Sequence, residues 1–228
     1  MGEQGLTSYF QFNNVNWPNV WTAAWETLWM TVISVLIVAI FGILLGLLLY
    51  QTDGSKNPAV KVLNWIVGFF VNVFRSIPFI ILIVLLLPVT QVVMGAITGA
   101  KAAIPSLVVS AAPFYARLVQ IAFNDVDNGV IEAAYAMGAN SWQVVRKVLI
   151  PESMPALVSG ITVTAISLIG YTAMAGAIGA GGLGQLAYTD GFQSYNNAIT
   201  LAATVVIVII VFAFQFLGDW ITRKVDKR

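Results

Sequence analysis

Long apolar stretches separated by short polar segments dominate this sequence. The stretch from Leu28 to Tyr50 contains 23 residues and no charge, and the stretch from Ala198 to Leu217 contains another 20. A helix needs about 20 apolar residues to cross a hydrocarbon core of ~30 Å. Both stretches are therefore predicted to be transmembrane helices.

Less regular patterns predict three further crossings. Residues 153–178 are uncharged and rich in Gly, Ala, Ser and Thr, which suits a helix packed among other helices. Residues 62–97 are too few for two crossings, so we expect one long helix that bends at Pro78. The predicted fold is an all-α integral membrane protein with five transmembrane helices, at about 20–50, 58–97, 102–123, 153–178 and 196–217.

Basic residues in short loops predict the orientation, because such loops stay in the cytoplasm. Only Lys101 falls on the other side. The prediction places residues 1–19, with Glu3 and no basic residue, outside the cell, and residues 218–228 in a basic cytoplasmic tail that follows the transmembrane domain 20–217. The cytoplasmic basic residues are Lys56, Lys61, Arg146, Lys147, Arg223, Lys224, Lys227 and Arg228.

Composition and charge exclude several function classes. The chain is 59% hydrophobic and 9% charged, against about 45–50% and about 25% in average proteins. It has no Cys and no His, which excludes disulfides, thiolate or imidazole metal sites and His-dependent nucleophiles. A net charge of +1 gives no basis for nucleic-acid binding. No phosphate-binding loop of the Gly-x4-Gly-Lys-Ser/Thr type is present, so we expect no ATP site in this chain.

The only sizeable polar stretch, 124–152, is predicted to be a cytoplasmic loop of two short helices. Acidic and Asn residues at 125–128 favour a helix start, and Gly138 is expected to end that helix with a positive φ. A second helix, capped by Asn140 or Ser141, would stop before Pro151 and carry an apolar stripe of Trp142, Val145, Val148 and Leu149. This shape suits docking into a groove on a partner or packing against the membrane surface, and shape alone leaves both open.

The loop resembles a known sequence motif. Glu132-Ala133-Ala134, three residues, Gly138, nine residues and then Val148-Leu149-Ile150-Pro151 are similar to the EAA loop of ABC importer permeases, although that family prefers Ile and Leu where this chain has Val148 and Ile150. The resemblance implies the type I importer permease fold and a coupling helix that sits in a cleft of a cytoplasmic ATPase. It assigns ATPase coupling to Glu132 (polar contact), Ala133 and Ala134 (close approach), Gly138 (the turn), Ala139 and Pro151.

The resemblance extends from about residue 20 to the C-terminus. Stretches 74–79, 112–117 and 170–184 are most similar to methionine-importer permeases. Permeases for polar amino acids, glycine betaine or phosphonate share the loop, so a permease for one of these solutes is the alternative. The resemblance implies a transport subunit that is not an enzyme and holds no cofactor, in a bacterial inner membrane. The implied partners are a second copy (ten helices in all), two ATPase subunits that bind ATP and Mg, and an extracellular or periplasmic substrate-binding protein.

Tyr171 and Met174 are the candidate pathway residues. Their large side chains are expected to project from a narrow helix toward the symmetry axis of the dimer, and Met174 is a candidate gate. The alternative is that Met174 fills a packing gap, as flexible methionine side chains often do.

Other patterns have structural explanations. Gly179, Gly181 and Gly184 match a dinucleotide fingerprint, but no strand surrounds them and no carboxylate follows about 20 residues later. Gly42 and Gly46 predict close helix packing, within the chain or across a dimer.

Arg75 and Arg117 are expected to extend toward the cytoplasmic headgroups. Trp17, Trp21, Trp25 and Trp29 recur every four residues and are expected to anchor the chain at the membrane interface.

Two other function classes remain as alternatives. An ion-coupled secondary transporter or channel would suit Gly- and Pro-broken helices, but the predicted spans lack the Asp, Glu or His that would bind an ion by side chain. Backbone carbonyl sites stay possible for it. A membrane enzyme is the least favoured, because the spans supply no acid, base or metal ligand.

Overall fold

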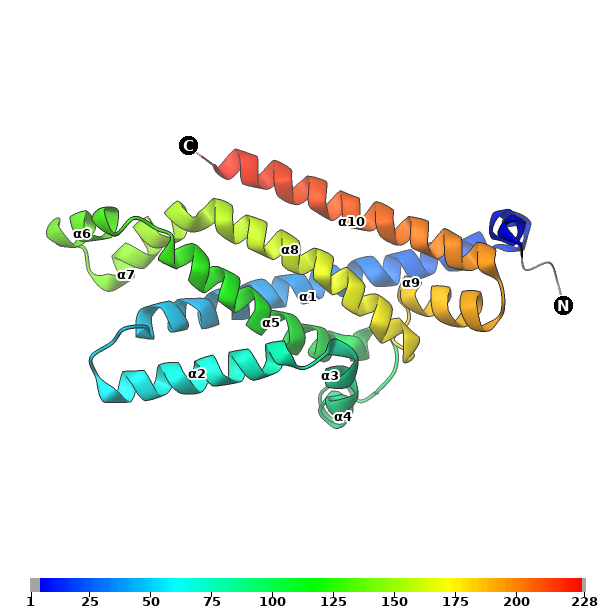
Figure 1. Cartoon of the computed structure of the whole chain (residues 1–228), viewed down its shortest axis with the longest axis horizontal. Coiled ribbons are helices and arrows are strands. Elements are labelled where there is room, and N and C mark those ends of the chain that lie inside the picture. Colours follow the sequence, from blue (N-terminus) through cyan, green and yellow to red (C-terminus); the bar gives the residue numbers. More distant parts are fainter. Residues whose placement is uncertain (1–4, 227–228) are drawn as a thin grey trace. The chain divides into compact units, whose positions relative to one another are not determined.

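The computed structural model describes residues 5–226, and all regular structure in that range is helical. Glu3, Lys227 and Arg228, which the orientation argument used, lie outside the described residues. Two short 3-10 helices, Leu6–Phe10 and Phe12–Asn14, precede the helices labelled in Figure 1. These are α1 (Trp17–Thr52), α2 (Pro58–Ser76), α3 (Phe79–Leu85), α4 (Leu87–Met94), α5 (Ala100–Asn124), α6 (Asn128–Ala136), α7 (Ser141–Val144), α8 (Ile150–Ala177), α9 (Gly182–Gln185) and α10 (Asn197–Val225), with π-helical turns at Val145–Leu149 and Leu186–Gln193.

Five helices of the described chain are long and apolar enough to cross a membrane, as the sequence predicts. They are Trp17–Thr52, Pro58–Ser76, Ala100–Asn124, Ser141–Ala177 and Asn197–Val225. The last helix runs well past residue 217, so Arg223 and Lys224 lie on its final turns rather than in a separate tail. There the Lys224 ammonium lies 3.9 Å from the centre of the Trp220 ring, a cation–π contact.

The expected single helix over 58–97 is wrong, because the chain forms three helices there. Proline has no N–H to donate and disfavours helical backbone in the residue before it. Accordingly α2 ends at Ser76, and Pro78, in an extended conformation, precedes α3. A second break at Leu86 precedes α4, which carries Pro88 in its first turn, where a missing N–H costs nothing. Only α2 is long enough to span.

The second loop helix was expected to stop before Pro151, and this expectation is wrong. The helix instead continues past Pro151 into a candidate membrane span. Residues Ser141–Ala177 form one run in which Val145–Leu149 is a π-helical turn, closed by a hydrogen bond from the Ile150 N–H to the Val145 carbonyl. In a regular α-helix, the ring of Pro151 would collide with the carbonyl four residues earlier. The wider turn changes that register, so the helix passes through the proline.

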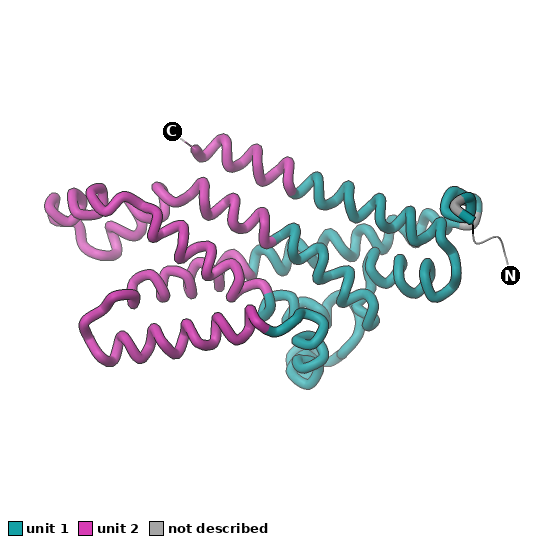
Figure 2. The backbone as a smooth tube through the Cα atoms, in the orientation of Figure 1, with its two compact units in different colours: residues 1–37, 77–110, 165–214 teal, residues 38–76, 111–164, 215–228 magenta. Residues whose placement is uncertain are grey.

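The chain divides into two compact units, coloured separately in Figure 2. Unit 1 comprises residues 1–37, 77–110 and 165–214, and unit 2 comprises residues 38–76, 111–164 and 215–228. Among the described residues, every Lys and Arg except Lys101 belongs to unit 2. The two units therefore differ sharply in their content of basic residues.

In unit 2, the C-terminal half of α1 packs directly on α5. A β-carbon at Gly42 would collide with the Tyr115 ring, and one at Gly46 would lie 2.6 Å from Val119 Cβ and 2.7 Å from the Ala116 carbonyl oxygen. The Gly-x3-Gly pair thus supports a contact within the chain. Tyr115 is buried, and its hydroxyl donates a hydrogen bond of 3.1 Å to the Leu157 carbonyl of α8.

In unit 1, the N-terminal half of α1 packs with α8, α9 and α10 around a core that includes Val20, Ala24, Ile169, Leu183 and Ala203. The glycines of the supposed dinucleotide fingerprint belong to this packing. Gly179 and Gly181 have φ values of +94° and +80°, which favour glycine, as does the neighbouring Gly182 at +73°. A side chain at Gly184 would collide with the backbone of Ala173.

Candidate functional site: the coupling segment

The loop between α5 and α8 folds into a compact segment, residues 125–149, that we call the coupling segment. Its first helix, α6, is capped by Asp127, whose Oδ1 accepts a 2.8 Å hydrogen bond from the Gly129 N–H. A carboxylate here satisfies a free N–H and complements the helix dipole. The acidic start predicted from the sequence is therefore present.

Gly138 ends α6 with a φ of +85°. Its N–H donates to the Tyr135 carbonyl at 2.9 Å, and the N–H of Ala139 donates to the Ala134 carbonyl at 3.1 Å. This pair of bonds is the Schellman arrangement, which places the residue after the helix in the left-handed region. The positive φ predicted for Gly138 is confirmed.

Asn140 starts α7 two residues after that turn. The Gln143 N–H donates to Asn140 Oδ1 and the Asn140 N–H donates to Gln143 Oε1, both at 2.9 Å, so the two residues form a capping box. Two capped helix ends therefore meet with only three residues, 137–139, between the end of α6 and the Asn140 cap. This short connection fixes the direction of the chain between the two helices.

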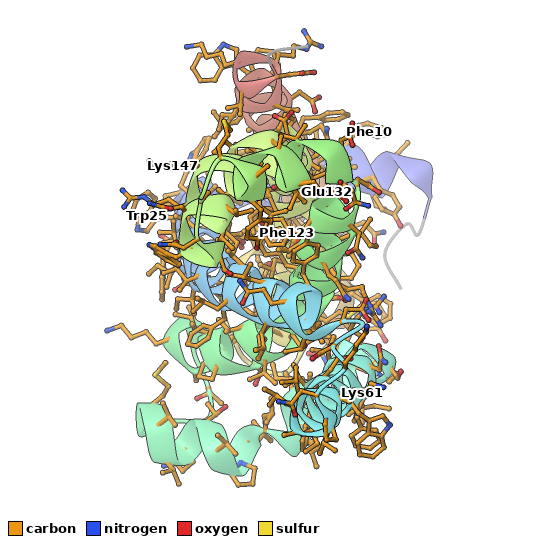
Figure 3. The ribbon with its side chains drawn as sticks, turned by 90° about the vertical axis from the view of Figure 1, so that its left-hand side faces the viewer. Phe10, Trp25, Lys61, Phe123, Glu132 and Lys147 are labelled. Carbon is orange, nitrogen blue, oxygen red and sulfur yellow. The ribbon has the colours of Figure 1, made fainter. Side chains whose placement is uncertain are left out.

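The coupling segment separates the motif residues between two faces. Glu132 and Ala133 are exposed and Gly138 is also exposed, whereas Ala134 is 5% exposed and faces inward. Ala139 is half-buried and Pro151 is exposed at the start of α8. In Figure 3, Glu132 and Lys147 lie on opposite sides of the view, with buried Phe123 between them. Ala134 thus supports the fold of the segment, and Glu132 and Ala133 are available to a partner.

The apolar stripe expected in the second helix is only partly correct. Val145 and Leu149 are buried, together with Val144, whereas Trp142 is 66% exposed. A regular helix would place residues 142 and 149 on one face, but the π-helical turn changes the rotation between them. Trp142 and Met137, which is 83% exposed, add large apolar side chains to the surface of the coupling segment. Sequence reasoning missed Met137, although an apolar residue beside the helix-stop glycine was a usable signal.

The two candidate pathway residues have different surroundings within unit 1. The Tyr171 ring stacks on the Phe79 ring of α3, with centroids 4.7 Å apart and planes inclined by 9°. Met174, one turn further along α8, is 48% exposed. Met174 therefore does not fill a gap inside the described chain, which was the alternative reading.

Arg117 has specific partners in unit 2. Its guanidinium donates to Gln120 Oε1 at 2.7 Å and to Asn72 Oδ1 of α2 at 3.3 Å. Arg117 thus links α5 to α2 by hydrogen bonds, a role that the sequence analysis did not predict. Arg75 is exposed in the last turn of α2, and its extension toward the headgroups stays a prediction.

Glu26 corrects one premise of the sequence argument, because α1 begins at Trp17 and so contains this carboxylate within a candidate span. Its Oε2 accepts a 2.7 Å hydrogen bond from the Gly182 N–H, and Thr27 Oγ1 accepts one of 2.9 Å from the Leu183 N–H. Glu26 therefore caps the start of α9. Within residues 5–226, no group of three or more His, Cys, Asp or Glu side chains could hold a metal ion.

Comparison with known proteins gives consistent results. The methionine import system permease protein MetP of Bacillus subtilis is 59% identical over 95% of this chain and 98% of its own length. A probable D-methionine transport system permease protein MetI of Pasteurella multocida is 48% identical over 72% of this chain and 76% of its own length. A chain from an inward-facing structure of the MetNI methionine ABC transporter superposes with a TM-score of 0.88 at 46% identity, covering 92% of this chain and 97% of that one.

The match to a family description covers most of the sequence. Residues 42–228, which include the whole coupling segment, match the family described as "Binding-protein-dependent transport system inner membrane component". Together with the extent of identity to the permease proteins, this match establishes the class of protein. The chain belongs to the binding-protein-dependent transport system inner membrane component family.

Proposed function

We propose that this chain is the membrane-spanning permease subunit of an ATP-driven methionine importer and that the coupling segment transmits movements of a cytoplasmic ATPase. The observation that carries the proposal is the 59% identity, over nearly the full length of both chains, to a methionine import permease. The ATPase, a separate subunit, binds ATP and Mg and hydrolyses the nucleotide. This chain needs no cofactor for its part.

The geometry of the coupling segment supports the assigned contacts. Glu132 and Ala133 project from α6 into solvent, and Met137 and Trp142 are large exposed apolar side chains of the same coupling segment. Exposed apolar side chains are typical of a surface that binds another protein. In this proposal Gly138 and Ala139 set the angle of the segment, and Pro151 marks where it joins the membrane helix.

A homodimer supplies the pathway in this proposal. The face of α8 that carries Gly170, Met174 and Ala177 is exposed in the single chain. A second copy facing it across a two-fold axis would enclose a path between two narrow helices, with Met174 on the path and Tyr171 held behind it by Phe79. A substrate-binding protein outside the cell would deliver methionine to this path.

The decisive experiment reconstitutes the chain with its ATPase in lipid and measures ATP hydrolysis with and without a methionine-loaded binding protein. We expect stimulation in the wild type and its loss in Glu132→Ala and Gly138→Val. Glu152→Ala is the matched control, because Glu152 is an exposed carboxylate in the first turn of α8, outside the coupling segment. That variant should be stimulated normally.

Two results would count against the proposal. Failure to bind any ATPase, combined with uptake driven by an ion gradient, would favour the secondary transporter. Stimulation by a binding protein loaded with a polar amino acid, betaine or phosphonate, and none with methionine, would keep the ABC permease and change its substrate.

The gate is tested separately with Met174→Ala. A gate predicts substrate leak through the reconstituted permease with ATPase binding unchanged, since Met174 lies far along α8 from the coupling segment. Lower thermal stability without leak would return Met174 to a packing role.

A further inference from the structure

A cavity of about 700 Å³ lies inside unit 2, next to the coupling segment. Its walls come from the end of α1 and the turn that follows, from Asn124 at the end of α5, and from α6, α7 and the π-helical turn. Cavities that bind small molecules are about 300–1,000 Å³. None of the motif residues Glu132, Ala133 and Gly138 lines it, so the cavity is distinct from the proposed ATPase contact.

The polar part of the lining carries a single charge, and that charge is negative. Asp53 supplies it, and no Lys or Arg is among the lining residues. The other polar groups are hydroxyls and amides, from Tyr50, Gln51, Asn124, Tyr135 and Ser141. Asp53 is exposed, and its carboxylate would repel an anion placed here, whereas a cation would be attracted. The charge of the lining therefore selects cations.

Two aromatic rings strengthen this preference. The Tyr50 ring is held against the buried Phe123 ring, with centroids 5.7 Å apart and planes at 64°, and Tyr135 projects from α6. Ring faces attract ammonium groups, and a cage of aromatic rings with a carboxylate is a common way to bind organic cations. An inorganic ion would not need so large a space.

The remaining lining is aliphatic. Ile131 is half-buried and offers apolar surface beside the two tyrosine rings, whereas Val144, Val145 and Leu149, each at most 4% exposed, pack behind the cavity. A ligand that fills the cavity should therefore combine a cationic head with an apolar body.

We propose that this cavity is a binding site for a small organic cation with an apolar body, of the alkyl- or arylammonium class. Because α1 and α5 form one wall and the coupling segment forms the other, the bound cation holds the segment in its present position against the helix ends. The regulatory consequence, a change in ATPase coupling, rests on the function proposed above. Binding itself does not.

The first experiment measures binding to the full chain alone in lipid nanodiscs by calorimetry. The probe is 2-phenylethylammonium, and 2-phenylethanol and phenylacetate are its neutral and anionic counterparts. We expect saturable binding of the ammonium, at least tenfold weaker binding of the alcohol and none of the anion. Equal binding of all three, or no saturable binding of the ammonium, would overturn the proposal.

Matched variants locate the site. Asp53→Asn should weaken ammonium binding at least tenfold, and Tyr135→Leu severalfold. Asp125→Asn should leave it unchanged, because Asp125 is an exposed carboxylate that follows the lining residue Asn124 but does not itself line the cavity. Unchanged affinity in Asp53→Asn, or an equal loss in Asp125→Asn, would place the bound cation elsewhere and refute the assignment.

Hydrogen exchange tests the link to the coupling segment without any ATPase. If opening of the segment destroys the cavity, the bound probe must leave before the amides of residues 128–144 can exchange. The probe at ten times its Kd should therefore slow the exchange of these amides about tenfold. Binding without this protection would refute the holding role. A chain that shows binding and protection but never couples to an ATPase would contradict the proposed function and leave this site intact.

Discussion

At the residue scale, Gly138 is required by backbone geometry and not by lack of space. Its φ is +85°, and a β-carbon there would meet no atom within 4 Å. We predict that Gly138→Ala lowers the free energy of unfolding by about 1 kcal/mol, the cost of left-handed backbone for a residue with a side chain. Gly68→Ala is the control, because Gly68 is helical and a β-carbon there comes no closer than 3.9 Å to Leu49. Denaturation in mixed micelles measures both, and equal effects would contradict the backbone argument.

Tyr115 makes a second prediction at this scale. Its buried hydroxyl donates to the Leu157 carbonyl, so Tyr115→Phe removes one buried hydrogen bond and retains the ring that packs on Gly42. We expect a loss of about 1 kcal/mol in unfolding free energy. Tyr195→Phe, at an 84% exposed site, should cost almost nothing in the same denaturation assay. A loss of several kcal/mol in Tyr115→Phe would indicate that the ring had moved.

At the element scale, the contact between α1 and α5 depends on Gly46, because the atoms that a side chain there would meet cannot move aside easily. At Gly46 the new β-carbon would press on Val119 Cβ and on the backbone oxygen of Ala116. Backbone atoms do not move aside cheaply, so we predict that Gly46→Ala costs about 1–3 kcal/mol of unfolding free energy. Unaltered stability would show that the two helices separate easily.

Helix existence was predictable at this scale, and helix continuity was not. Runs of apolar residues predict the five spans, because a membrane helix needs only length and apolarity. The three pieces between 58 and 94 and the uninterrupted helix through Pro151 depend on how the backbone accommodates prolines. Pro78 breaks a helix, whereas Pro151 follows a π-helical turn in a continuous run and Pro105, Pro113 and Pro155 lie within helices, so the presence of a proline alone does not predict the outcome.

The contrast between local features, which the sequence predicts, and features that depend on packing also applies to the site. Caps are local, so Asp127, Gly138 and Asn140 could be identified from residue type and spacing. The inward position of Ala134 depends on the packing of α6 against α7 and the π-helical turn, and the outward position of Trp142 depends on the rotation at that turn. Neither leaves a pattern in the sequence. The caps predict the turns of the coupling segment, and its exposed face had to come from the structure.

The start of α9 offers a prediction about a cap supplied by another helix. Glu26 accepts the Gly182 N–H, a hydrogen bond to a charged group. We predict that Glu26→Ala speeds exchange of the Gly182 amide at least tenfold, corresponding to about 1.5 kcal/mol for such a bond. Glu26→Gln, which keeps an acceptor oxygen, should lie in between. If both variants exchange like the wild type, the carboxylate does not hold α9.

At the scale of the whole molecule, the distribution of charge predicts how the chain lies in the membrane. Every described Lys and Arg except Lys101 belongs to unit 2, which also contains the coupling segment and the end of α10. The exposed Trp17, Trp21 and Trp25 belong to unit 1 and suit an interface without basic residues. We therefore predict that unit 2 faces the cytoplasm and unit 1 the exterior.

Because the chain has no cysteine, single cysteines give a clean test of that orientation. Lys56→Cys in the turn after α1 and Ser194→Cys before α10 are both at exposed positions. A membrane-impermeant maleimide should label Ser194→Cys in right-side-out vesicles and Lys56→Cys only in inverted ones, with both labelled after detergent is added. The reverse pattern would invert the topology and place the coupling segment outside, where no ATPase could reach it. Equal labelling of one variant from both sides would show mixed insertion, and the charge asymmetry would then be too weak to orient the chain.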